Sequence, residues 1–187
     1  FAVSRDDLKP ALTGVLFKFN QNNITTVATD GHRLVKYETI NNTATDQAED
    51  VIVPKKFLNL LSGSLGDEKI KLSVGESHLT TTVGSDQYFT RIIDEKFPDF
   101  DGVIPKDNDK NFNVDRNLLL SAVKRVSIFS NKSTHQIALQ LNNEQTSVST
   151  EDPEQSTKAS EEIKGNYQGE DIMVGYNAAY LKDVLSH

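Results

Sequence analysis

The stretch FAVSRDDLKPALTGVLF at residues 1–17 recurs, in altered form, as FNVDRNLLLSAVKRVSIF at residues 112–129. Identical residues align at a shift of 111, among them Phe1, Val3, Arg5 and Leu8, which fall on Phe112, Val114, Arg116 and Leu119. Ser4 falls on Asp115, and both types cap helix N-termini because a side-chain oxygen accepts from an unpaired backbone N–H. Apolar residues then follow at the helical spacing i, i+4, i+7: Leu8, Leu12 and Val15 in one copy, Leu119, Val123 and Val126 in the other. Each copy is predicted to form a strand, a cap and an amphipathic helix, with a kink or late start at Pro10.

A second helix signal ends each copy. Residues 51–61 pass from an apolar strand through Pro54, at the first helical position, into apolar residues three and four apart. Residues 172–185 repeat the pattern, with Asn177 as the expected cap. The apolar positions of the two helices align, Phe57, Leu60 and Leu61 falling on Leu181, Val184 and Leu185. Two tandem domains of one design are predicted, joined between residues 97 and 110.

Between the helix signals the sequence alternates with period two, which is typical of strands. Residues 24–29 and 32–37 are rich in β-branched types and flank Asp30-Gly31, a strong hairpin signal because this turn requires positive φ. Further strands are expected at residues 69–74, 79–83 and 88–93, and surface hairpins over residues 142–169. The predicted fold class is α+β, with helices packed on antiparallel sheets in each domain.

Composition narrows the functional classes. The chain has 187 residues, no cysteine and a formal net charge of −7. Disulfides and thiolate metal sites are excluded, a reducing cytoplasm is expected, and no apolar run approaches the roughly 20 residues of a membrane span. The negative charge argues against a nucleic-acid partner unless basic residues are segregated on one surface. The first and last residues both fall inside expected elements, which predicts a fragment cut at both ends.

Several segments resemble the bacterial DNA sliding clamps, the beta subunits of DNA polymerase III. The matching segments are TVATDGHRL (residues 26–34), KFPDF (96–100), VIP (103–105) and GYNAAYLKDVL (175–185), and they occur in the family's order. The resemblance implies that residues 1–104 are the second (central) clamp domain and residues 105–187 the third (C-terminal) domain, truncated before its last strands. It also implies a homodimeric ring of tandem domains around duplex DNA, with helices lining the hole and sheets forming the outer wall.

The resemblance further implies a processivity factor that is not an enzyme and needs no cofactor or metal. Its partners would be duplex DNA, bound without sequence specificity, and the replicative polymerase, clamp loader and repair proteins, docked through short linear peptides. In that family the peptide pocket lies between the second and third domains. Carried over by motif, its wall is Leu12, Thr29, Gly31, His32, Arg33, Leu34, Pro98 and Val103. A glycine turn beside apolar residues suits such a groove, because Gly31 lets a peptide approach while the apolar side chains bury an aromatic or leucine anchor.

For DNA, the lysines at the predicted start of the second helix are the leading candidates. Lys55 and Lys56 oppose the helix macrodipole by about 0.3–1 kcal/mol each, and a nearby polyanion would offset that cost. Further phosphate contacts are expected from basic residues on the other hole-lining helices, namely Lys9, Lys124, Arg125 and Lys182. The alternative for each residue is a solvated surface charge.

The sequence alone leaves two other functional classes as alternatives. Asp30 and His32 have the side chains of a small hydrolase, although strand neighbours point to opposite faces and no second His or Cys stands at ligand spacing. A secreted structural repeat protein is the other alternative, since the polar strands and the lack of cysteine are compatible with it. Neither a phosphate-binding glycine loop nor a nucleophile elbow occurs in the sequence.

Overall fold

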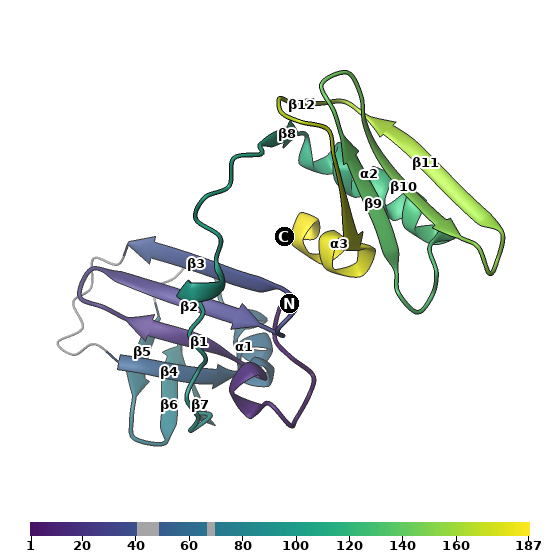
Figure 1. Ribbon diagram of the computed structural model, residues 1–187. Helices are drawn as coiled ribbons and strands as arrows, with labels where there is room; N and C mark the ends of the chain where they lie inside the picture. Colours follow the sequence, from purple (N-terminus) through teal and green to yellow (C-terminus); the bar gives the residue numbers. More distant parts are fainter. Residues whose placement is uncertain (41–48, 67–69) are drawn as a thin grey trace. The chain divides into compact units, whose positions relative to one another are not determined.

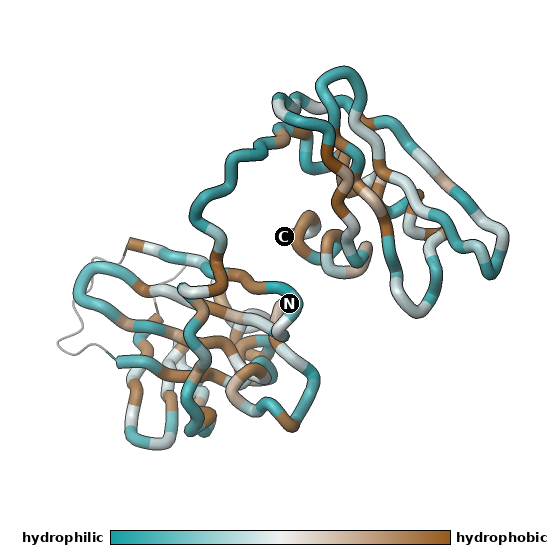
Figure 2. The backbone as a smooth tube through the Cα atoms, viewed as in Figure 1, coloured by the Kyte–Doolittle hydropathy of each residue, from teal (hydrophilic) through white to brown (hydrophobic). Residues whose placement is uncertain are grey.

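The computed structural model describes residues 1–40, 49–66 and 70–187. The chain divides into two compact units, Phe1–Val103 and Ile104–His187. Both units combine helices with antiparallel sheets, so the fold is α+β (Figure 1). Residues 105–111, close after the division, are hydrophilic (Figure 2).

Unit 1 is built on a four-stranded antiparallel sheet with the order β3-β2-β1-β4. Its strands are β1 (Gly14–Phe19), β2 (Asn23–Thr29), β3 (Leu34–Ile40) and β4 (Glu49–Pro54). Helix α1 (Lys55–Ser62) follows β4 directly, and a three-stranded sheet β5-β6-β7 comes next. Its strands are β5 (Lys71–Val74), β6 (His78–Val83) and β7 (Asp86–Arg91), and two 3₁₀ turns, η1 (Pro10–Leu12) and η2 (Asp101–Val103), complete the unit.

The two faces of the larger sheet have different coverings. On one face, side chains of β1 and β4 pack with α1 and β6 in a core of Phe19, Val51, Val53, Phe57, Leu61, Leu79 and Val83. On the opposite face, Leu16 of β1 is opposite Val27 of β2 and Ile52 of β4, and all three are buried. Residues after β7 cross this second face, where Ile93 bridges to Ile52.

Unit 2 repeats the four-stranded arrangement with the order β11-β10-β9-β13. Its elements are β8 (Phe112–Val114), α2 (Arg116–Val126), η3 (Ser127–Phe129), β9 (Gln136–Leu141), β10 (Thr146–Asp152), β11 (Thr157–Ile163), β12 (Gly165–Tyr167), β13 (Ile172–Asn177) and α3 (Ala178–Ser186). Both α-helices begin at the expected caps. The Asp115 side chain accepts from the Leu118 amide at 2.9 Å, and Asn177 accepts from the Ala179 and Tyr180 amides.

The repeat is confirmed, but in a different alignment from the one predicted. Strands β1, β2, β3 and β4 with α1 have the same order and pairing as β9, β10, β11 and β13 with α3. Both expected second helices, α1 and α3, are present, and one hairpin, β10–β11, lies within residues 142–169, where surface hairpins were expected. Of the predicted strand at 69–74, Lys69 lies outside the described residues, and Lys71–Val74 form β5.

The strand and helix predicted over residues 1–17 are wrong. Phe1 to Lys9 form no strand or helix, Pro10–Leu12 are a single 3₁₀ turn, and β1 begins at Gly14. Ser4 does not cap a helix: its hydroxyl accepts from the Asp6 amide at 3.0 Å, and its own amide donates to the Leu12 carbonyl at 2.8 Å. Pro10 has no N–H to donate to a helix, and the alternation in GVLFKF favours a strand. The described residues of unit 1 therefore contain one α-helix, not the two expected.

Candidate functional site

Three predicted pocket residues meet at one end of the unit 1 sheet. Thr29 is the last residue of β2 and is paired with Leu34, the first residue of β3. Leu12 lies two residues before the start of β1, which is antiparallel to β2. Neighbouring antiparallel strands run in opposite directions, so the start of β1, the end of β2 and the start of β3 lie at the same end of the sheet, which we call the loop edge. Leu12, Thr29 and Leu34 therefore lie at the loop edge. Leu12 and Leu34 are half-buried, so they offer apolar surface there.

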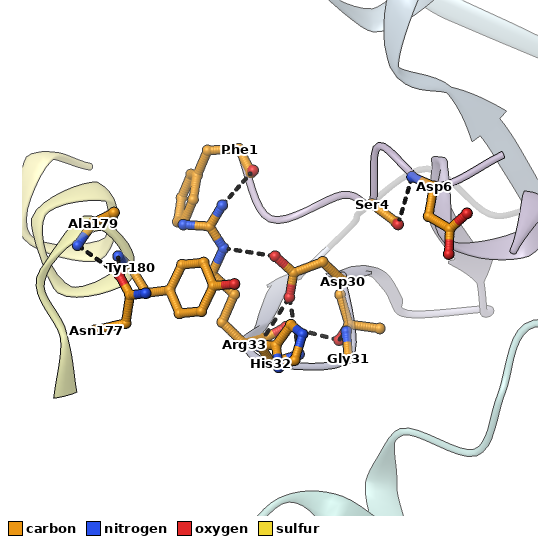
Figure 3. Close-up of polar contacts among 11 residues, drawn as sticks. Phe1, Ser4, Asp6, Asp30, Gly31, His32, Arg33, Asn177, Ala179 and Tyr180 are labelled. Carbon is orange, nitrogen blue, oxygen red and sulfur yellow. Dashed lines mark hydrogen bonds and ion pairs between the residues drawn. The ribbon is translucent and has the colours of Figure 1, made fainter. Parts of the chain in front are cut away.

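A tightly bonded loop joins β2 to β3 at this edge (Figure 3). Oδ1 of Asp30 accepts from the amides of His32 and Arg33 at 3.0 and 3.1 Å, and the Thr29 hydroxyl donates to the Arg33 carbonyl at 2.7 Å. Gly31 has φ of +90°, and a β-carbon built there would meet no atom within 4 Å. The loop thus needs glycine for its conformation, and it leaves open space beside Gly31.

Arg33 is bound back onto its own unit. Its Nε donates to Oδ2 of Asp30 at 3.1 Å, and its terminal nitrogen donates to the Phe1 carbonyl at 3.3 Å. The guanidinium also lies 5.7 Å from the centre of the Phe1 ring, a cation–π distance. Only 15% of each side chain of the Asp30–Arg33 pair is exposed. Arg33 therefore ties the loop to the start of the chain.

The electrostatics of the loop favour an ionised Asp30. Burial raises the pKa of its carboxyl, but the hydrogen bonds from the His32 and Arg33 amides and the charge of Arg33 together lower the pKa below its ordinary value. A carboxylate committed to three donors is poorly placed to act as a general base, and His32 is exposed. Among the described residues, no group of three or more His, Cys, Asp or Glu could hold a metal ion. The geometry therefore gives no support to a hydrolase.

Pro98 and Val103 lie on the segment that follows β7. In Figure 1 this segment crosses the sheet in front of β4, β1 and β2 and ends at η2. Both residues are exposed, Val103 by 68%. Pro98 lines a cavity of about 350 Å³ between the segment and the sheet. All eight predicted pocket residues thus belong to unit 1.

The predicted DNA-contacting residues differ in their local structure. Lys55 and Lys56 occupy the first turn of α1, as expected, and Pro54 before them makes no side-chain cap. Lys124 and Arg125 lie in the last turn of α2, where cations interact favourably with the helix dipole, and Lys182 lies on α3. Lys9 was predicted to be helical, and this is wrong. It precedes η1, because Pro10 and the start of β1 leave no helix there.

Arg125 and Lys182 already have partners within unit 2. The Arg125 guanidinium binds both carboxylate oxygens of Glu161, through Nε at 2.9 Å and through a terminal nitrogen. This pairing raises the pKa of Arg125 and lowers the pKa of Glu161. The Lys182 ammonium donates to the Ser127 hydroxyl at 3.3 Å.

Sequence reasoning missed two aromatic residues that hold the site. The Arg33 guanidinium lies over the Phe1 ring and donates to the Phe1 carbonyl. Phe100 is buried, and its ring lies near the ammonium groups of Lys18 and Lys36. The residue spacing gives no signal for either contact, because both join segments that are distant in sequence.

No helix in the described part of the chain is long and apolar enough to cross a membrane.

Comparisons with known proteins agree with this architecture. Residues 1–99 match the model of the DNA polymerase III beta subunit, central domain, and residues 101–187 match that of its C-terminal domain. The chain is 35% identical over 187 residues to the beta sliding clamp of Pseudomonas putida, covering 99% of the chain and 51% of that protein. It is 30% identical over 190 residues to the beta sliding clamp of Escherichia coli, again covering 51% of the relative.

Solved structures give the same result. A crystal structure of the DNA polymerase III subunit beta from Pseudomonas aeruginosa superposes with a TM-score of 0.94 at 33% identity, covering 100% of this chain and 52% of that one. A sliding clamp from the same organism, bound to griselimycin, gives a TM-score of 0.93 at 33% identity, covering 100% of this chain and 51% of that one. The chain thus spans about half the length of the curated relatives it matches. With both of its halves matched in order, the chain belongs to the DNA polymerase III beta subunit family of sliding clamps.

Proposed function

We propose that this chain is part of a DNA sliding clamp that encircles duplex DNA and tethers the replicative polymerase as its processivity factor. The observation that carries the proposal is the end-to-end match to two consecutive clamp domains, in a chain whose two halves repeat one sheet order. Residues 1–104 act as the central domain, and residues 105–187 act as the C-terminal domain. The role is mechanical, and no catalytic step is assigned to the chain.

The peptide-docking site lies at the end of the unit 1 sheet where the loop joins β2 to β3. Leu12 and Leu34 supply apolar surface, and Gly31 leaves the space for a peptide backbone. The complete proposed wall is Leu12, Thr29, Gly31, His32, Arg33, Leu34, Pro98 and Val103. Its occupants are short linear peptides of the polymerase, the clamp loader and repair proteins. Griselimycin, which is bound to the Pseudomonas aeruginosa clamp, is proposed to bind here too.

DNA is held by weak contacts to phosphates, which leave the sequence unread and let the ring slide. Lys55, Lys56 and Lys124 are the strongest candidates, because they lie on helices and no ion pair is assigned to them among the described residues. Lys9 and Lys182 contribute from a loop and from α3. Arg125 contributes least, because Glu161 balances its charge. The ring is a homodimer of the full-length protein in the cytoplasm.

A topological assay tests the clamp function. The intact protein that contains this chain is loaded onto nicked circular DNA by its loader and separated from free protein by gel filtration. A sliding ring stays with the circle and is released when the DNA is linearised, because its hold is topological. Equal retention on circular and linear DNA would show ordinary binding and would reject the proposal.

A matched pair of substitutions tests the pocket. Leu34→Asp places a charge in the proposed apolar wall and is expected to weaken binding of a fluorescein-labelled peptide with adjacent Leu and Phe side chains by at least about a hundredfold. Ile40→Asp is the control, since Ile40 lies at the far end of the same strand and is 84% exposed. Griselimycin is expected to compete with the peptide. If the two variants bind the peptide with equal affinity, the proposed pocket does not lie at the loop edge.

A further inference from the structure

The segment that carries Pro98 and Val103 is attached to the sheet at two points. We call residues 94–103 the linker segment. Immediately before it, the Ile93 amide donates to the Ile52 carbonyl at 2.9 Å, which fixes its start to β4. Near its end, Phe100 is 7% exposed and Asp101 pairs with Lys36 of β3 at 3.2 Å. The attachments therefore lie on the two edge strands of the sheet.

Strand register places the Phe100 ring over the middle of the sheet. Lys18 of β1 is opposite Thr25, and Lys36 of β3 is opposite Val27, so the two lysines flank β2. The Phe100 ring centre lies 5.6 Å from the Lys18 ammonium and 5.7 Å from the Lys36 ammonium. The ring therefore lies beside both cations, on the face of the sheet where Thr25 and Val27 of β2 are buried.

Between the attachments the linker segment lies over an open cleft. A cavity of about 350 Å³ lies beneath it, with Leu16 and Ile52 of the sheet and Phe97 of the segment among its lining residues. Phe97 meets Phe100 edge to face, with ring centres 6.4 Å apart. Phe100 is the one buried residue of the linker segment, and the residues on either side of it are half-buried or exposed. The contacts of Phe100 are therefore the main apolar attachment of the segment that carries Pro98 and Val103.

We propose that Phe100 is a positioning residue of the peptide pocket: held between Lys18 and Lys36, it fixes the linker segment so that Pro98 and Val103 stand at the pocket wall. This inference rests on the proposed peptide-docking function. Phe100 is itself buried against the sheet and touches no peptide. Its contribution is preorganisation, because a wall that is already in place need not be ordered when the peptide binds.

The size of the effect follows from the population of the competent arrangement. If the segment occupies its bound position only a tenth of the time once the ring is removed, the apparent peptide Kd rises about tenfold, since the apparent Kd scales inversely with the competent fraction. Phe100→Ala is expected to produce a loss of this order. Phe100→Tyr retains a ring between the lysines and is expected to restore affinity to within about twofold.

The test compares these variants in the intact protein, using the fluorescein-labelled Leu-Phe peptide. Phe89→Ala is the matched control, because Phe89 lies on β7 and is 74% exposed. Hydrogen exchange of the unliganded protein is the second readout. The Val103 amide donates to the Phe100 carbonyl at 3.3 Å and is expected to lose protection in Phe100→Ala, while the Ile93 amide keeps it. General destabilisation would instead expose both amides.

A second set of variants separates the effect of the two lysine charges near the Phe100 ring from the effect of the Lys36–Asp101 ion pair. Lys18→Gln with Lys36→Gln removes both charges from the ring, and Asp101→Asn removes only the partner of Lys36. The double lysine variant is expected to weaken peptide binding more than Asp101→Asn does. If Phe100→Ala fails to fold, this milder double variant and Phe100→Leu carry the same comparison.

The outcomes separate this inference from the pocket proposal. Weakened binding in Phe100→Ala, with rescue by tyrosine and local exposure at Val103, supports the inference. If Leu34→Asp abolishes binding while Phe100→Ala binds like Phe89→Ala, the pocket stands and the positioning role is rejected. If neither Leu34→Asp nor Phe100→Ala changes peptide affinity, the docking function itself is rejected.

Discussion

Replacing Asp30 tests how strongly the loop between β2 and β3 is held. Three hydrogen bonds reach its carboxylate, from the His32 amide, the Arg33 amide and the Arg33 Nε. A hydrogen bond to a charged group contributes about 1.5–3 kcal/mol, but the freed donors of a surface loop regain water. Asp30→Ala is therefore expected to lower the free energy of unfolding of unit 1 by about 2 kcal/mol. At roughly 4–8 °C per kcal/mol for a domain near 100 residues, the Tm falls by about 10 °C.

Differential scanning calorimetry of the chain measures this change, with the transition of unit 2 as an internal reference. Asp7→Ala is the matched control, because Asp7 is exposed in the same unit. Asp30→Asn keeps an acceptor for the two amides and loses the ion pair, so it is expected to cost about half as much as Asp30→Ala. A Tm of Asp30→Ala equal to that of Asp7→Ala would refute the role assigned to the loop bonds.

The pH dependence has a fixed sign. Burial raises the pKa of Asp30, but hydrogen bonds from His32 and Arg33 together with the charge of Arg33 leave the pKa lower in the folded state. Its stabilisation is therefore complete above the unfolded-state pKa of about 3.9 and is lost as the pH falls through the folded value. The Tm difference between wild type and Asp30→Asn is expected to be constant from about pH 7 to pH 5 and to shrink below about pH 4. A gap that widens in acid would contradict this sign.

Three further variants, the first of them a double substitution, probe other parts of the chain. Lys55→Glu with Lys56→Glu is expected to shorten retention on circular DNA by on the order of tenfold at low salt, whereas Lys71→Glu on β5 is expected to leave it unchanged. Equal retention times of the two variants would show that Lys55 and Lys56 do not contact DNA. Asn177→Ala removes the cap of α3 and is expected to destabilise unit 2 by about 1 kcal/mol in chemical denaturation, and an unaltered midpoint would count against the cap. Gly14→Ala places a β-carbon 2.7 Å from a backbone oxygen of β4 and is expected to destabilise unit 1 by about 1–3 kcal/mol, which a wild-type melting curve would disprove.

Local patterns were sufficient where a single element decided the structure. Pro54 followed by apolar residues three and four apart predicted α1, and Asn177 predicted the start of α3. Asp30-Gly31 predicted the connection of β2 to β3, although β3 begins at Leu34 rather than His32. These predictions succeed because capping, proline placement and turn conformation depend on neighbours in sequence.

The opening of the chain could not be predicted from such patterns. The apolar residues Leu8, Leu12 and Val15 partly fit a helix and partly fit an alternating strand. The similarity of this segment to residues 112–129 favoured the helix, which is wrong. The pairing of β1 with β2 and β4 decides the matter, since all six residues of GVLFKF pair with β4 and four of them also pair with β2. Long-range pairing of this kind overrides local propensity.

The candidate site could be predicted in part. The motif TVATDGHRL placed Thr29 and Leu34 on neighbouring strands, which the register confirms. The ties from Phe1 to Arg33 and from Phe100 to Lys18 and Lys36 join segments more than thirty residues apart, so no spacing rule reveals them. Such contacts depend on the tertiary fold alone.

Mapping the bound peptide directly on this chain tests the central claim that the loop edge of the unit 1 sheet is the docking site. The ¹⁵N-labelled chain is titrated with the Leu-Phe peptide, and amide chemical shifts are followed by NMR. The account predicts that the largest shifts occur at Leu12, Thr29, Gly31, Leu34 and Val103, and that griselimycin moves the same amides. Shifts concentrated elsewhere, such as along α1 or within unit 2, would contradict it.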